Sequence, residues 1–314
     1  MANISLSIIT VTYGNRWNFL ERNLEKLESI SFINEIIIVN NGSVYDLEEK
    51  IASLKNTNIK LVDIGYNSGS ANGFSEGIST FITNLSEKKN LNEQWVLLLD
   101  DDNIISKLDI DAFNKQLSNG EIAYFCNRLS RDVSNKGTLL YNSFLGFNCF
   151  PSKRVVGDNS LELLPYSGLL INAEALKLIG LPKKEYYLYC DDYDYSYRLI
   201  KNNIKTELIP SCEIEDLEVS WNKEVSDFVN STLSGNPTKV YYSVRNRINF
   251  EKYNLVNNQF YFIANFLLFL LYIPYKILKN KMKFNKSSLK ALYLGLKDGI
   301  SGKLGIHKDY KLSA

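Results

Sequence analysis

The stretch Gln94-Trp95-Val96-Leu97-Leu98-Leu99-Asp100-Asp101-Asp102 decides what kind of fold this chain adopts. Its apolar part, Trp95–Leu99, predicts a strand that is buried on both faces, as the strands of parallel sheets are. Three carboxylates at the end of that strand repel one another and favour a bound cation. A divalent metal that also holds phosphate oxygens is the simplest such cation. A solvated acidic turn that caps the next helix is the alternative.

Strands and helices alternate in the first third of the chain. Strand-like runs at 6–13, 35–40, 59–64 and 94–100 are separated by segments with helical spacing of apolar residues. This alternation predicts an α/β fold with a Rossmann-like, mostly parallel sheet, which binds ligands outside the carboxyl ends of its strands. Polar motifs follow these strand ends, at 12–16, 40–43, 67–73 and 100–102.

The middle of the chain is less regular. Its pattern predicts strands at 120–127, 139–150 and 166–172, a short helix at 173–179 and a longer helix at 195–203. A second acidic cluster, Asp191, Asp192 and Asp194, precedes that longer helix. Clustered carboxylates raise one another's pKa toward the working pH of a general base, although helix capping explains them equally well.

Together, the two acidic clusters describe a transferase that acts on nucleotide sugars. Alternate residues of an extended segment point the same way, so Asp100 and Asp102 are expected to share a metal while Asp101 points elsewhere. The metal, Mn²⁺ or Mg²⁺, neutralises a leaving diphosphate, and a carboxylate of the second cluster deprotonates the acceptor hydroxyl.

Charge is distributed unevenly along the chain. The formal net charge of the 314 residues is +1, yet the residues from Lys276 onward hold ten lysines and two aspartates, which leaves −7 for the first 275 residues. A basic tail on an acidic body suggests an anionic surface as a partner. The four cysteines lack CxxC spacing, so we expect a reducing cytosol, and no N-terminal signal is expected.

The longest hydrophobic stretch lies near the C-terminus. No charged residue occurs between Asn254 and Tyr275, a length that suffices to cross a bilayer. A spanning helix, an interfacial helix and a buried helix all remain open, but the lysines that follow favour a helix lying on an anionic leaflet. We therefore predict two parts, a catalytic domain at 1–253 and a hydrophobic and basic helical segment at 254–314.

Several motifs, in this order along the chain, carry a resemblance to family 2 glycosyltransferases of the GT-A fold. They are Val11–Arg16, Val39–Ser43 with Asp46, Asn67–Phe74, Leu99–Asp102, Tyr189–Leu199 and Tyr241–Arg247. The glycine-rich motif at 67–74 is similar to that of galactofuranosyltransferase-like members, and a rhamnosyltransferase-like subgroup is the second match. The resemblance implies an inverting, metal-dependent transferase whose catalytic base is Asp192.

The resemblance also assigns binding residues. Those expected to bind the donor are Thr12, Arg16, Asn41, Asp46, Asn67, Gly69, Asp101 and Gly168. Those expected to bind the acceptor are Asp191, Asp194, Trp221 and Arg245. The expected metal ligands are Asp100, Asp102 and Asp216, the last because it aligns with a histidine that these enzymes often use. The chain's single histidine, His307, lies in the basic tail instead.

The expected donor is UDP-galactofuranose, with dTDP-rhamnose second, and the expected acceptor is a growing, lipid-linked surface glycan of a capsule or cell envelope. The enzyme would be peripheral, on the cytoplasmic side of the plasma membrane, and a homo-oligomer is possible. The alternative is a catalytically silent subunit that binds nucleotide sugar or glycan in a polysaccharide assembly complex. A nucleic-acid partner is not expected, because no surface interleaves aromatic and basic residues.

Overall fold

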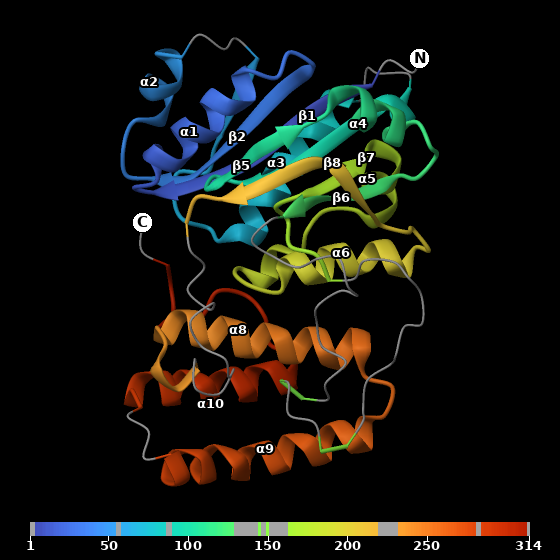
Figure 1. Ribbon diagram of the computed structural model, residues 1–314. Coiled ribbons are helices and arrows are strands. Elements are labelled where there is room, and N and C mark those ends of the chain that lie inside the picture. The colour runs from blue at the N-terminus through green and yellow to red at the C-terminus, as the bar shows by residue number, and fades with distance from the viewer. Residues whose placement is uncertain are drawn as a thin grey trace.

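The computed structural model describes residues 4–54, 58–85, 90–128, 144–145, 149–150, 163–218, 232–280 and 284–312. It has an α/β layer built on one sheet and, beneath it, a layer of helices from the C-terminal part of the chain (Figure 1). Helix α6 (Asp191–Lys201) lies between the sheet and that helical layer. The predicted α/β class is therefore confirmed.

The sheet has eight strands in the order β3-β2-β1-β4-β7-β6-β8-β5. The first four of these pair in parallel, as predicted: β3 (Ile59–Asp63), β2 (Ile33–Ser43), β1 (Ser5–Gly14) and β4 (Gln94–Asp100). The central residues of β1, β2 and β4 are mostly apolar and almost fully buried, because helices cover both sides, whereas β3 at the edge of the sheet is only partly buried. The strand that contains Trp95–Leu99 thus lies in the middle of the sheet.

The other half of the sheet is mixed. β7 (Leu169–Asn172) runs antiparallel to both β4 and β6 (Ala123–Arg128), while β8 (Glu207–Asp216) is parallel to β6 and antiparallel to β5 (Asn103–Leu108). Neither β5 nor β8 was predicted from the sequence. The predicted strand at 139–150 lies largely outside the described residues.

Helices cover the two faces of the sheet and fix its core. α3 (Ser70–Asn84) packs so closely on β1 that a Cβ on Gly73 or Gly77 would lie 2.5 Å from a side chain of that strand. α1 (Trp17–Glu28) and α4 (Ile110–Leu117) pack on the opposite face. Of two short helices, α2 (Leu47–Ala52) packs on the face of α1, and α5 (Ala173–Ile179) packs on the face of α3.

The helical layer begins before the predicted boundary at 253/254. α8 (Pro237–Phe250) packs tightly against α10 (Lys286–Ser301), and a π-helical turn at Glu251–Leu255 leads to α9 (Gln259–Asn280). Since α8 shares its core with α9 and α10, the boundary separates helices that pack together. Whether the two parts fold independently stays a prediction.

Candidate active site

The three aspartates after β4 lie beside the end of β1, and their side chains differ in direction. Asp101 is buried, and it accepts hydrogen bonds from the Thr12 hydroxyl at 2.9 Å and from Nε of Arg16 at 2.9 and 3.0 Å. The two side chains thus bind each other inside the protein, and their contacts with a donor stay predictions.

Asp100 and Asp102 form the more accessible carboxylate pair. Burial and the charge of Asp100 raise the pKa of Asp102 to about 6, and Nη2 of Arg16 lies 3.1 Å from an oxygen of Asp102. Two hard-oxygen groups with mutual repulsion are a donor set that fits Mg²⁺ or Mn²⁺. Arg16 also pairs with Glu218 at 2.7 Å, so its guanidinium joins three acids at this edge.

Asp216, the predicted third metal ligand, has other partners. Its carboxylate forms an ion pair with Arg128 and accepts a hydrogen bond from Nδ2 of Asn103 at 2.8 Å. Asn103 and Asp216 are register partners on β5 and β8, so the sheet itself creates this pairing. Among the residues that the structure describes, no three histidine, cysteine or acidic side chains gather as a metal site. Asp216 is thus paired within the sheet, and its role as a metal ligand stays a prediction.

The second acidic cluster forms the first turn of α6, which starts at Asp191 rather than at 195 as predicted. Carboxylates are stabilised there by the positive end of the helix dipole. Asp191 is buried and accepts a hydrogen bond from the Ser70 hydroxyl at 2.8 Å, while Asp194 is buried against Arg198 at 2.6 Å and Lys183 at 2.8 Å. Both are buried and paired within the protein, and their predicted contacts with the acceptor stay predictions.

Asp192 is the half-buried acid of this cluster. Burial is the main cause that raises the pKa of Tyr166, and the charges of Asp191 and Asp192 add to the rise. Burial raises the pKa of Asp191 to about 6, and the charge of Asp100 contributes to that rise. The two acidic clusters are therefore near enough to interact electrostatically, and Asp192 presents the more accessible carboxylate of the second one.

The glycine-rich loop before α3 connects the donor edge to α6. Gly69 has a φ of +82°, and a Cβ there would lie 2.0 Å from the carbonyl oxygen of Tyr187. The side-chain amide of Asn41 binds this loop. Its oxygen accepts from the backbone N–H of Ser68 at 2.9 Å, and its nitrogen donates to the carbonyl of Gly69 at 3.2 Å. Gly69 and buried Asn41, both predicted to contact the donor, thus shape the loop instead.

Two further predicted donor residues have structural partners. Asp46 is the N-cap of α2 and accepts from the backbone N–H of Glu49 at 2.9 Å. Gly168 has a φ of +102°, and its N–H donates to the carbonyl of Leu98 in β4 at 2.9 Å. A Cβ at this position would lie 3.1 Å from the Phe125 ring. A Cβ at Gly168 would thus point into the core, and the close approach of a donor sugar there stays a prediction.

Arg245 was predicted to contact the acceptor and is instead almost fully buried in α8. Its guanidinium donates to the backbone carbonyls of Tyr186 at 3.0 Å and Gly305, and it lies 4.7 Å from the Tyr242 ring centroid. Trp221, the remaining predicted acceptor residue, lies outside the described residues. The sequence singled out the Tyr241–Arg247 motif as a segment that contacts the acceptor, whereas in the structure Arg245 of this motif packs inside the protein.

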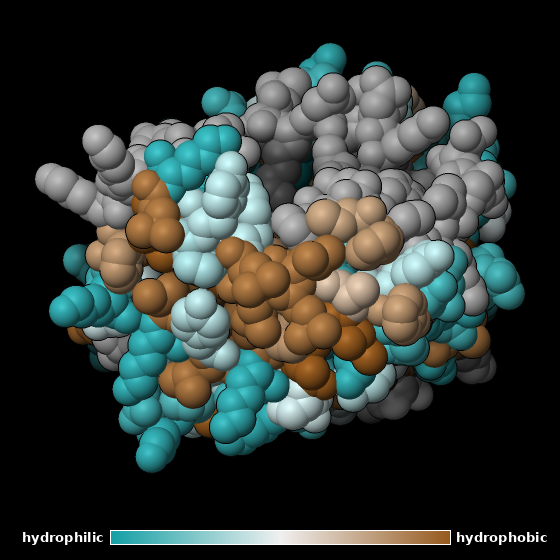
Figure 2. All heavy atoms as spheres, turned by 90° about the horizontal axis from the view of Figure 1, so that it is seen from below, coloured by the Kyte–Doolittle hydropathy of each residue, from teal (hydrophilic) through white to brown (hydrophobic). Residues whose placement is uncertain are grey.

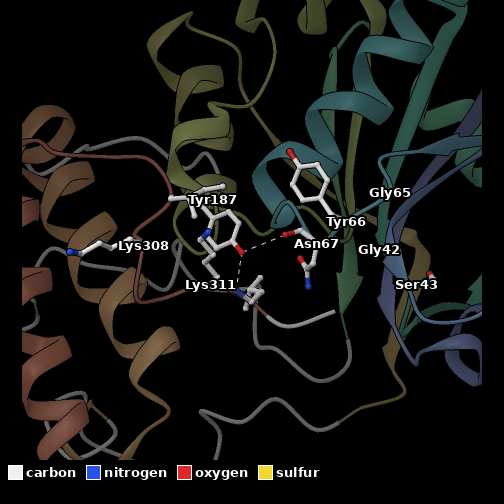
Figure 3. A pocket seen from close by; sticks show the side chains of 10 residues that line it. Gly42, Ser43, Gly65, Tyr66, Asn67, Tyr187, Lys308 and Lys311 are labelled. Atoms are coloured by element: carbon white, nitrogen blue, oxygen red, sulfur yellow. Dashed lines mark hydrogen bonds between the residues drawn. The ribbon is translucent and has the colours of Figure 1, made fainter.

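A pocket of about 580 Å³ opens at the ends of β2 and β3. Figure 3 shows Tyr66 and Asn67 on one side and Tyr187 beside Lys311 of the C-terminal tail on the other. The Tyr187 hydroxyl receives a hydrogen bond from the backbone N–H of Leu312 at 3.0 Å. The sequence had predicted Asn67 at this edge but not the return of the tail to it.

The chain matches one known protein family. The profile of glycosyl transferase family 2 matches residues 7–172, more than half of the chain. Curated protein sequences yield no match.

Solved structures resemble the chain in fold. The mannosyltransferase PcManGT from Pyrobaculum calidifontis, solved with GDP-Man and Mn²⁺, is 12% identical with a TM-score of 0.51, over 94% of this chain and 73% of that one. TarS of S. aureus is 13% identical with a TM-score of 0.50, over 80% of this chain and 44% of that one. GalNAc-T7, solved with UDP, GalNAc and Mn²⁺, is 11% identical with a TM-score of 0.50, over 78% and 52%. This chain thus spans about half the length of TarS and GalNAc-T7. The chain belongs to glycosyl transferase family 2 and is a glycosyltransferase with the GT-A fold.

Proposed function

We propose that the chain transfers a sugar from a nucleoside diphosphate donor to a hydroxyl of a growing surface glycan, with inversion at the anomeric carbon. The observation that carries this proposal is the approach of two acidic clusters at one edge of the sheet, Asp100 and Asp102 after β4 and Asp192 in the first turn of α6. One cluster suits a metal and a diphosphate, and the other suits a general base.

The base is Asp192. Asp191 and Asp194 are buried, whereas Asp192 is half-buried and so presents the most accessible carboxylate of the three. Asp192 accepts the proton of the acceptor hydroxyl, and the hydroxyl oxygen attacks the anomeric carbon on the face opposite the diphosphate. Inversion follows from this in-line displacement, because one attack on the opposite face forms the new bond as the old one breaks.

Asp100 and Asp102 would hold Mn²⁺ or Mg²⁺, with donor oxygens and water as the remaining ligands. When bound, the ion supplies positive charge to the diphosphate leaving group. Support for Mn²⁺ comes from PcManGT and GalNAc-T7, which were solved with that ion. Arg16, which lies against Asp101 and Asp102, is placed to add a second positive charge beside the same diphosphate.

The nucleoside would occupy the pocket at the ends of β2 and β3, near Ser43, Tyr66 and Asn67. Tyr66 is 60% exposed and offers an aromatic face for a base. We retain UDP-galactofuranose as the first donor to test and dTDP-rhamnose as the second, on the resemblance of the glycine-rich segment. GDP-Man belongs in the same screen because PcManGT was solved with it.

We also propose that α9 lies in the surface of an anionic membrane, on the cytoplasmic side, where a lipid-linked acceptor is available. One helix of the described chain, 259–279, is long and apolar enough to cross a membrane. Its buried face, which includes Phe262, Asn265 and Phe269, packs on the protein, and Asn265 exchanges hydrogen bonds with the backbone of Phe150 at 2.7 and 3.0 Å. A helix attached in this way along one face favours an in-plane position over a spanning one.

The opposite face of α9 is apolar and exposed. Seen from below in Figure 2, hydrophobic side chains gather there, with hydrophilic ones around them. The most exposed apolar residues are Phe260, Ile263, Leu267, Leu271 and Leu278, with exposures from 53% to 78%. Lys279 and Lys286 at the end of α9 and the start of α10 add the positive charge that anionic lipids attract.

Sedimentation with vesicles tests this membrane contact. We expect the protein to sediment with phosphatidylglycerol vesicles and Leu271→Glu to weaken that binding. The matched control is Leu178→Glu, since Leu178 is 60% exposed on α5, outside α9. If Leu271→Glu sediments as wild type does, the proposed lipid contact of α9 is wrong.

A catalytically silent subunit is the second candidate function. One observation favours it: the carboxylate of Asp216, the predicted third metal ligand, forms an ion pair with Arg128 in this structure. Such a subunit would bind UDP with Mn²⁺ in a calorimeter but would turn over no donor.

A donor screen separates the two candidates. Release of UDP, dTDP or GDP is measured from the three donors above with Mn²⁺ and a hydroxyl acceptor. We expect turnover of one donor, its loss in Asp192→Asn, and normal turnover in Asp109→Asn, because Asp109 caps α4. Full activity of Asp192→Asn refutes its role as base. Failure to bind any nucleotide refutes both candidate functions.

A further inference from the structure

The segment directly before the acids of α6 has a strained backbone. Three of its residues, none of them glycine, have left-handed φ angles: Tyr187 at +66°, Tyr189 at +66° and Cys190 at +60°. Tyr187, with a ψ of −60°, forms the centre of a γ-turn of the rare, strained type, closed by the N–H of Leu188 on the carbonyl of Tyr186 at 2.8 Å. L-residues seldom adopt these angles, so other contacts must hold them.

Asn246 of α8 supplies those contacts. Its amide nitrogen lies 2.8 Å from the carbonyl oxygen of Tyr186, 2.6 Å from that of Leu188 and 2.9 Å from that of Tyr189. These three carbonyls surround the strained residues, and one fully buried side chain thus holds the backbone on both sides of the γ-turn. Donors that satisfy several buried carbonyls are costly to remove.

Arg245 orients this amide and extends the clamp. Its Nε donates to Oδ1 of Asn246 at 2.7 Å, which turns the amide nitrogen toward the carbonyls. Its terminal nitrogens donate to the carbonyls of Tyr186 and Glu185, and to that of Gly305 in the C-terminal tail. The guanidinium therefore joins three segments that are far apart in the sequence.

The clamped segment sets the start of the helix that carries the acids. The carbonyl of Cys190 accepts the N–H of Asp194 at 2.9 Å, which is the first hydrogen bond of α6. Cys190 has φ +60° and ψ −1°, so its conformation fixes the direction in which α6 leaves the segment. A shift of that residue would rotate the first turn and move Asp192.

We infer that Arg245 and Asn246 are positioning residues that hold Asp192 at the acceptor hydroxyl by fixing the left-handed backbone of 186–190. This inference rests on the proposed role of Asp192 as the base. Asn246 does not contact the carbonyl of Tyr187, which faces Gly69 and receives the N–H of Ala71 at 3.3 Å. Loosening the clamp should therefore disturb the base more than the donor loop.

The test compares Asn246→Ala with Asn249→Ala in the full chain. Asn249 is also buried on α8, one turn later, but accepts only from the Tyr186 hydroxyl, at 3.3 Å. We expect Asn246→Ala to lower kcat about 100-fold, since displacement of a reacting group by about 1 Å has that effect. We expect the calorimetric affinity for UDP with Mn²⁺ to stay unchanged, and Asn249→Ala to keep wild-type kcat.

Arg245→Lys gives a second variant, which keeps the buried charge with fewer donors and should lower kcat less than Asn246→Ala. Hydrogen exchange of the wild type adds a measurement that needs no variant: the amides of 187–190 should be as protected as those of α8. Wild-type kcat in folded Asn246→Ala, or rapid exchange at 187–190 beside a protected α8, overturns the inference. If Asp192→Asn is itself fully active, the proposed function fails first, which distinguishes the two failures.

Discussion

Gly69 offers a direct test of how the glycine-rich loop is built. Its φ of +82° and ψ of 164° fall in a region that only glycine adopts readily, and a Cβ would lie 2.0 Å from the carbonyl oxygen of Tyr187. Alanine there must adopt the strained backbone and also push that carbonyl away. The backbone term is about 1–3 kcal/mol and the overpacking term about 1–3 kcal/mol, so we expect Gly69→Ala to lower the free energy of unfolding by about 2–6 kcal/mol.

Gly120→Ala is the matched control. Gly120 has a φ of +94°, but no atom lies within 4 Å of the position of its Cβ. It should therefore lose only the backbone term, about 1–2 kcal/mol for an L-residue in left-handed backbone. Urea unfolding measures both values. Because the displaced carbonyl belongs to Tyr187, Gly69→Ala should also lower kcat, whereas Gly120→Ala should not.

The comparison has a clear negative result. If the two variants unfold at the same urea concentration and turn over donor equally, the close contact between Gly69 and Tyr187 does not exist in solution. A stability loss without a change in kcat would keep the contact but separate it from the position of the acids.

Three further predictions follow from the site and its supports. Asp102→Asn should abolish binding of Mn²⁺ in titrations followed by electron paramagnetic resonance, and unchanged binding would exclude Asp102 as a ligand. The pKa of Asp191 is raised to about 6, so its contribution to stability is present below pH 4 and is lost as the pH rises through 6. Between pH 4 and pH 8, the free energy of unfolding of Asp191→Asn, measured in urea, should therefore rise by about 3 kcal/mol relative to that of the wild type. Gly299→Ala places a methyl 2.7 Å from the carbonyl oxygen of Arg245, and thermal unfolding should show a loss of about 1–3 kcal/mol.

The parallel half of the sheet was predictable because the residues within each strand carry a pattern that identifies it. β1, β2 and β4 each contain a largely apolar run and β3 a short alternating one, so these strands can be recognised without their partners. β5 and β8 lack that signal, since charged and polar residues alternate with apolar ones and β5 follows β4 after two residues. Their existence depends on pairing between segments far apart in the chain, which the sequence pattern does not reveal.

The candidate site was predictable in place but not in orientation. The motifs with Thr12, Asn41, Gly69, Asp101 and Asp191 all lie at the predicted edge, yet four of these residues have buried side chains bound within the protein, and Gly69 packs against the Tyr187 carbonyl. A polar residue after a strand serves equally well as a ligand or as a support for one. Long-range partners decide between these roles: Ser70 for Asp191, Arg16 for Asp101 and the Tyr187 carbonyl for Gly69.

These contacts also couple the glycine-rich loop to the start of α6. Ser70, in the first turn of α3, donates to Asp191 in the first turn of α6, and the carbonyl of Tyr187 receives the N–H of Ala71. The loop proposed to line the donor and the helix proposed to carry the base are therefore tied at two points. A substitution in the loop that moves Ala71 must also move Tyr187 and the start of α6. Variants of the glycine-rich loop should consequently change kcat and KM together, whereas loss of the Asn246 amide, which binds the carbonyls of Tyr186, Leu188 and Tyr189, should lower kcat more than it changes KM.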